Sequence, residues 1–98
     1  IPARAFFRHP NILEFECHDG VDSIEKMAFG GCPSLRRVKM PGVKIVESEA
    51  ICCCKYLADV ECDKLERIGS YAFHYCPRLR SINLTSVKIV EKWAFSCY

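Results

Sequence analysis

The chain has 98 residues, of which 50% are hydrophobic and 27% charged, and this balance is typical of a globular protein and argues against disorder. The formal net charge of +2 is too small to indicate a nucleic-acid or membrane-surface partner. The longest apolar runs are far shorter than a membrane-spanning helix requires, so we expect no direct membrane insertion.

A dipeptide of alanine and an apolar residue recurs along the chain at a nearly constant interval. Its alanines are separated by 23, 22, 22 and 22 residues, and phenylalanine follows all of them except the third, which precedes Ile51. Positions at fixed distances before and after each alanine are apolar in every copy. Such a period indicates units that bury their apolar faces by stacking on one another. The alanines are Ala5, Ala28, Ala50, Ala72 and Ala94.

In chain order, the sequence divides into repeats of about 1–23, 24–44, 45–64 and 65–86 and a partial repeat 87–98. The first repeat is the least regular, because it has His9 where later repeats have cysteine and one extra residue in its loop near Asp19. Both ends of the chain fall inside a repeat. We therefore expect a single repeat segment, open at both ends, that is a fragment of a longer protein.

Two extended segments and one turn-rich segment are expected in each repeat. Residues nine to twelve after the alanine alternate between polar and apolar, as in Asp59–Cys62, and this period of two predicts a half-buried strand. Equivalent strands would run parallel, about 4.8 Å apart. A second short extended segment is predicted over Val43–Val46 and Val87–Val90. The Ala-Phe segment, which a proline ends in three repeats, is predicted to form one or two turns of α- or 3₁₀-helix.

The segments IEKMAFGGCPSL (24–35) and IGSYAFHYCPRL (68–79) show the pattern best. They resemble the BspA-like class of leucine-rich repeats, and the resemblance extends over essentially the whole chain. It implies a right-handed solenoid with a parallel β-sheet. It also implies a binding role, since such arrays occur in surface-exposed bacterial and protist proteins that bind other proteins or matrix components. The sequence departs from the pattern at His9, Ile51 and Lys55.

Eight cysteines raise the question of disulfides or a metal site. Cys32, Cys54 and Cys76 each follow an alanine by four residues and are expected to face the core as buried free thiols. The environments of Cys52, Cys53 and Cys97 are left open. The chain has no Cys-x-x-Cys pair and no zinc-type spacing of cysteine and histidine, so we expect neither a metal nor a cofactor. Cysteines without evident partners favour an intracellular, reducing compartment, with the cell surface as the alternative.

Catalysis is not expected from this segment. A nucleophile would need a histidine base and an orienting acid, and the three histidines fall at three different positions of the repeat. Gly30 and Gly31 lack the lysine and flanking residues of a phosphate-binding loop. We therefore expect a non-enzymatic protein.

The outward positions of the predicted longer strands form the first candidate binding surface. Acidic and basic residues alternate from one repeat to the next, which predicts two ladders of opposite charges across adjacent strands. The ladders either specify register and solubility or bind a protein partner. Asp59 and Glu61 interrupt the local arginines, so no long basic stripe for nucleic acid is formed. The two sets are Glu14, Arg37, Asp59 and Ser81, and Glu16, Lys39, Glu61 and Asn83.

A second candidate surface is the position immediately before each alanine, which we call the outer column. It includes Met27, Tyr71 and Trp93, which are large apolar or aromatic residues. Tyrosine and tryptophan are favoured at interfaces, but these residues could equally pack beneath a further repeat.

These features predict a module for protein–protein recognition or assembly that belongs to a larger protein or complex. One alternative is an extracellular adhesion module that binds matrix or carbohydrate. Another is a passive spacer or a regulatory appendage of an enzyme outside this segment.

Overall fold

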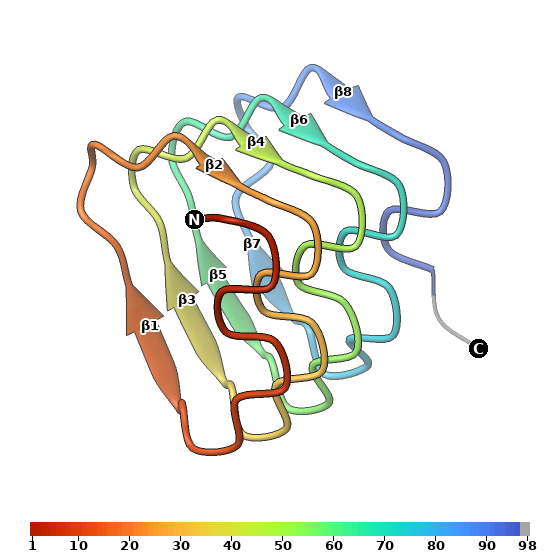
Figure 1. The fold of residues 1–98 in the computed structure, drawn as a ribbon. Coiled ribbons are helices and arrows are strands. Elements are labelled where there is room, and N and C mark those ends of the chain that lie inside the picture. Colours follow the sequence, from red (N-terminus) through yellow and green to blue (C-terminus); the bar gives the residue numbers. More distant parts are fainter. Residues whose placement is uncertain (97–98) are drawn as a thin grey trace.

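The computed structural model describes residues 1–96 as a coil of stacked rungs with eight short strands in two parallel sheets (Figure 1). We call the two sheets sheet A and sheet B. Sheet A contains β1 (Glu14–Glu16), β3 (Arg37–Lys39), β5 (Asp59–Glu61) and β7 (Ser81–Ile82). Sheet B contains β2 (Ser23–Ile24), β4 (Ile45–Val46), β6 (Arg67–Ile68) and β8 (Ile89–Val90).

Each strand pairs in parallel with the equivalent strand one repeat later. In sheet A, Phe15 is in register with Val38, and Val38 with Val60. In sheet B, Ile24 is in register with Val46. Viewed from the N-terminal end, the chain turns clockwise as it recedes, so the coil is right-handed (Figure 1). The predicted solenoid with parallel strands is therefore confirmed.

The third side of the coil is built from turns, and the expectation of α- or 3₁₀-helical turns there was wrong. Ala28 N–H donates to Glu25 O at 3.1 Å, and Gly30 N–H donates to Met27 O at 3.1 Å. Met27 has a φ of 60° and Gly31 a φ of 67°. A left-handed residue at every fourth position interrupts any right-handed helix. The N–H groups of Met27, Phe29 and Gly31 bond to the next rung.

The alanines allow the backbones of this turn face to approach closely. Phe29 N–H donates to Ala50 O, and Ile51 N–H donates to Ala72 O, both at 2.9 Å. Ala28, Ala50 and Ala72 are fully buried. A larger side chain there would occupy space needed by the neighbouring rung.

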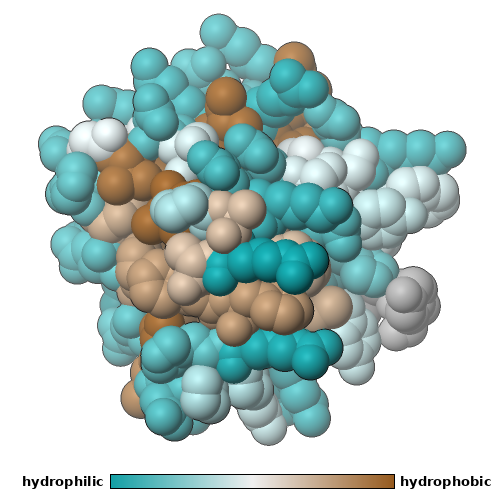
Figure 2. All heavy atoms as spheres, viewed as in Figure 1, coloured by the Kyte–Doolittle hydropathy of each residue, from teal (hydrophilic) through white to brown (hydrophobic). Residues whose placement is uncertain are grey.

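The core consists of the apolar columns that the sequence predicts. Phe6 stacks on Phe29 with ring centroids 5.2 Å apart, and Phe73 stacks on Phe95 with centroids 5.3 Å apart. In the view from the N-terminal end, apolar residues gather near the centre and hydrophilic residues surround them (Figure 2). Within residues 1–96, no helix is long and apolar enough to cross a membrane.

Candidate protein-recognition surface

Sheet A brings the predicted surface residues together in the predicted register. Glu14 pairs with Arg37 and Arg37 with Asp59, while Glu16 pairs with Lys39 and Lys39 with Glu61. The alternating burial of each strand places Phe15, Val38 and Val60 toward the core and the charged residues toward solvent. All eight predicted residues except Asp59 line two open hollows on this face, and Lys39 is shared by both.

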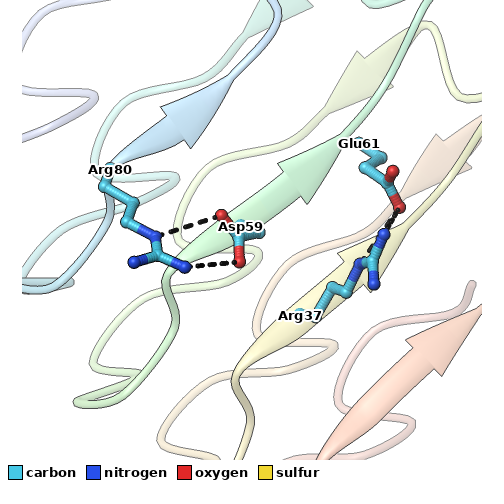
Figure 3. Close-up of polar contacts among 4 residues, drawn as sticks. All are labelled: Arg37, Asp59, Glu61 and Arg80. Atoms are coloured by element: carbon cyan, nitrogen blue, oxygen red, sulfur yellow. Dashed lines mark hydrogen bonds and ion pairs between the residues drawn. The ribbon is translucent and has the colours of Figure 1, made fainter.

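The ion pairs on this face differ from the predicted direct cross-strand pairs. Arg37 bonds diagonally to Glu61, with its Nη2 and Nε atoms 2.8 and 3.1 Å from Oε2 (Figure 3). Asp59 instead accepts from Arg80, 3.4 Å from Nε and 3.5 Å from Nη2 (Figure 3). The contact with Glu61 raises the pKa of Arg37. The register is therefore as predicted, but side-chain length sets the partners.

Three charges on this face have no ion-pair partner among residues 1–96. They are the carboxylates of Glu14 and Glu16 on β1 and the ammonium group of Lys39 on β3. All three side chains are exposed. The two glutamates and Lys39 are therefore available to charged groups of another molecule.

The predicted ladder of Glu16, Lys39 and Glu61 ends before Asn83. Strand β7 stops at Ile82, and Asn83 Oδ1 accepts a hydrogen bond from Thr85 N–H at 2.9 Å. Its main-chain carbonyl lies 3.5 Å from the Cys62 thiol. Asn83 thus belongs to the turn after the strand, where its side chain stabilises the local backbone.

The outer column points to solvent on a left-handed backbone. Tyr71 is 39% exposed and Trp93 is 54% exposed, whereas Met27 is half-buried beside the Cys52 thiol. The Tyr71 and His74 rings are perpendicular with centroids 5.1 Å apart, and the Lys92 ammonium lies 5.2 Å from the Trp93 ring centroid. The column has φ values between 58° and 66° at Arg4, Met27, Glu49, Tyr71 and Trp93.

The cysteine column has a structural role that the spacing alone did not reveal. The thiols of Cys32 and Cys54 donate to Phe6 O and Phe29 O of the preceding rungs, both at 3.0 Å. Cys76 makes the same contact with Ile51 O at 3.2 Å. These three cysteines are buried, as predicted, and each thiol bonds across a rung boundary. Cys97 lies outside the described residues.

One cysteine shares a repeat position with a histidine, because Cys52 and His74 both follow an alanine by two residues. His74 Nδ1 lies 2.6 Å from the hydroxyl of Ser96, one rung further on. Burial and the neighbouring Cys53 raise the pKa of the Cys52 thiol to about 12. A nucleophilic cysteine needs a lowered pKa, so Cys52 has the opposite electrostatic environment.

No group of three or more histidine, cysteine, aspartate or glutamate residues within residues 1–96 is arranged to hold a metal ion. The seven cysteines described carry free thiols.

The family model for a BspA-type leucine-rich-repeat region, with six copies, matches residues 1–98. The chain belongs to the BspA-type leucine-rich-repeat family. Leucine-rich repeats generally mediate protein–protein interactions and are typically non-catalytic. Neither a curated protein nor a solved structure shows significant similarity to this BspA-type chain.

A second set of surface residues, beside sheet A, was not predicted from the sequence. Tyr56 is 41% exposed, with the Arg78 guanidinium 5.1 Å and the Lys55 ammonium 5.8 Å from its ring centroid. Tyr56 and Arg78 both follow an alanine by six residues, so the repeat period was the signal for their stacking.

On sheet B, Arg67 forms a diagonal ion pair with Glu91 at 2.6 Å, which was also not predicted.

Proposed function

We propose that this BspA-type segment is a non-catalytic module for protein recognition or assembly, and that its primary contact surface is the outward face of sheet A. The observation that carries this proposal is the set of exposed charges on β1 and β3 that no other described residue neutralises. Ion pairs between described residues account for the charges of Arg37, Asp59 and Glu61. They do not explain Glu14, Glu16 and Lys39.

The shape of the face supports the same proposal. The parallel strands hold the outward residues at regular spacing on a rigid surface, and two open hollows cross it. A rigid array loses little conformational entropy when a partner binds. A partner that lies across the rungs would contact Glu14 and Glu16 on β1 and Lys39 on the neighbouring strand β3. The remaining proposed contacts are Arg37, Asp59, Glu61, Ser81 and Asn83.

The outer column offers a second contact area for the same function. Exposed tyrosine and tryptophan contribute disproportionately to binding energy at interfaces. Tyr71 and Trp93 occupy adjacent rungs of one column on the turn face, away from sheet A. We propose that they and Met27 contact a second region of the partner or a second partner.

Charge reversal distinguishes a recognition face from a passive spacer. The test uses immobilised protein and a lysate of the cells that produce it, with retained proteins quantified by mass spectrometry. The double variant Arg37→Glu/Lys39→Glu should lose a partner that the original protein retains. The matched control is Lys44→Glu/Lys88→Glu, which makes the same charge change at exposed positions outside sheet A. Equal capture by both variants would contradict the sheet A proposal.

A further inference from the structure

The turns that lead into the strands of sheet A hold more uncompensated positive charge than the sequence indicates. In the sequence, Asp59 and Glu61 interrupt the arginines. In the structure, Arg80 pairs with Asp59 and Arg37 pairs with Glu61. The acidic groups are thereby neutralised by two of the arginines. Arg36, Lys55 and Arg78 are left, and none of them forms a salt bridge within residues 1–96.

These three cations lie on consecutive rungs, and two of them, Lys55 and Arg78, lie against one exposed aromatic ring. Lys55 and Arg78 contact the Tyr56 ring from its own rung and the next. Arg36 is on the preceding rung, where its carbonyl oxygen accepts from Ala58 N–H at 2.9 Å. We call Arg36, Lys55, Tyr56 and Arg78 the basic corner.

We infer that the basic corner binds an acidic segment of the partner protein. This inference rests on the proposed function, since it names the chemistry of the partner next to sheet A. Arginine and tyrosine are enriched among the residues that dominate interface energies. An arginine guanidinium can bind a carboxylate through two parallel hydrogen bonds, and Arg78 and Lys55 both contact the Tyr56 ring, 5.1 and 5.8 Å from its centroid.

The surroundings of the corner favour a short acidic peptide over a nucleic acid. Glu14 and Glu16 stand unpaired at the β1 edge of the adjoining sheet. A long polyanion that continued across sheet A would meet these like charges, which disfavour its binding. A protein segment can present acidic residues to the corner and basic residues to β1.

Fluorescence anisotropy with labelled synthetic decapeptides tests the inference on the complete 98-residue chain. The probes are a glutamate-rich peptide, a glutamine-rich peptide of equal length and a single-stranded oligonucleotide. The glutamate peptide should bind at least tenfold more tightly than the glutamine peptide, and its affinity should fall as salt is raised. Binding that does not distinguish glutamate from glutamine would overturn the inference. So would tighter binding of the oligonucleotide than of the glutamate peptide.

Matched variants locate the site. Lys55→Ala/Arg78→Ala should weaken binding of the glutamate peptide roughly five- to tenfold, because two exposed charge contacts are removed. Lys44→Ala/Lys88→Ala makes the same change in net charge elsewhere and should leave binding within about twofold. Circular dichroism checks that both variants remain folded. Equal weakening by the two variants would mean that net charge, and not the corner, binds the peptide.

The two proposals fail in distinguishable ways. If only the inference about the basic corner is wrong, the glutamate peptide does not bind there, while Arg37→Glu/Lys39→Glu still loses the native partner. If only the sheet A proposal is wrong, the peptide binds the corner and that charge reversal leaves partner capture unchanged.

Discussion

Arg37 forms its ion pair with Glu61, diagonally across on β5, although its register partner on that strand is Asp59. The pattern recurs on sheet B, where Arg67 reaches Glu91 and not a residue directly opposite. In both cases the arginine bonds to a glutamate 24 residues later in the chain. Long side chains on a parallel sheet therefore join successive rungs by a diagonal link.

A double-mutant cycle on Arg37 and Glu61 should detect this link. Arg37→Ala and Glu61→Ala should couple in unfolding free energy, whereas Arg37→Ala and Asp59→Ala should couple more weakly. The coupling should decrease when salt is raised from about 0.05 to about 0.5 M, because both side chains are about half exposed. Urea denaturation of the single and double variants measures it. A stronger coupling to Asp59 would show that the direct pair dominates in solution.

Phe73→Ala should lower the unfolding free energy by about 3–5 kcal/mol. Phe73 is 1% exposed and stacks on Phe95, so its removal leaves a cavity in the middle of the coil. Phe95→Ala is the matched control: the same truncation at a residue that is 38% exposed should cost less than half as much. Urea denaturation gives both values. Similar losses for the two variants would contradict the core position of Phe73.

Gly42→Ala should strongly destabilise the first two rungs. A Cβ atom at Gly42 would lie 2.0 Å from the carbonyl oxygen of Asp19, which is backbone and cannot rotate away. Gly20→Ala is the control, because its nearest contacts are atoms of the movable His18 side chain. Hydrogen exchange should show faster opening around β1 and β3 for Gly42→Ala only. Native-like protection in that variant would mean that the turn adapts at little cost.

The sequence predicts the fold of this chain well because the core columns depend only on the repeat period. Val38 and Val60 occupy the same position in successive repeats and are in register, so if one of them faces inward the other does too. The turn face was harder to predict, because left-handed residues usually appear as glycine. Of the positions with positive φ within residues 1–96, only Gly31 gives that signal, while Met27 and Tyr71 adopt the same conformation without it. A hydrogen bond from Met27 N–H to Glu49 O of the next rung holds Met27 there, while Tyr71 O accepts from His74 N–H within its own rung.

The binding surface was only partly predictable for a different reason. The period shows which residues are neighbours, so the composition of the sheet A face followed from the sequence. It does not show which charges neutralise each other, since that depends on the length and rotamer of each side chain. Arg80 reaches Asp59, and Arg78 turns to the Tyr56 ring. The basic corner therefore becomes visible only in the structure.

Cys53→Gly should stabilise the protein by about 1 kcal/mol relative to Cys53→Ala. Cys53 is exposed and has a φ of 59°, a conformation that is strained for any residue with a Cβ atom. Both variants remove the thiol, so the difference between them isolates the backbone effect. Thermal denaturation at matched protein concentration measures it. Lower stability of the glycine variant would show that the hydrogen bonds of the turn face already offset the strain.

Cys52 should make stability fall at alkaline pH. Its folded-state pKa is about 12, against an ordinary value of 9.0 in the unfolded chain, because burial and the neighbouring Cys53 disfavour the thiolate. Below pH 9 both states hold the proton and the full stability is present. Between about pH 9 and 12 only the unfolded thiol loses it, so stability falls by about 1.4 kcal/mol per pH unit. Cys52→Ala removes this group and should flatten the decline.

Urea midpoints of the original protein and Cys52→Ala, measured from about pH 8 to about pH 10.5, test this linkage. Other groups titrate in the same range, but they are common to both proteins and cancel in the difference. Cys53→Ala should reduce the decline only in part, because it removes the smaller cause of the raised Cys52 pKa and leaves burial, the larger cause, in place. Parallel pH profiles for all three proteins would mean that the Cys52 thiol ionises equally easily in the folded and unfolded chains.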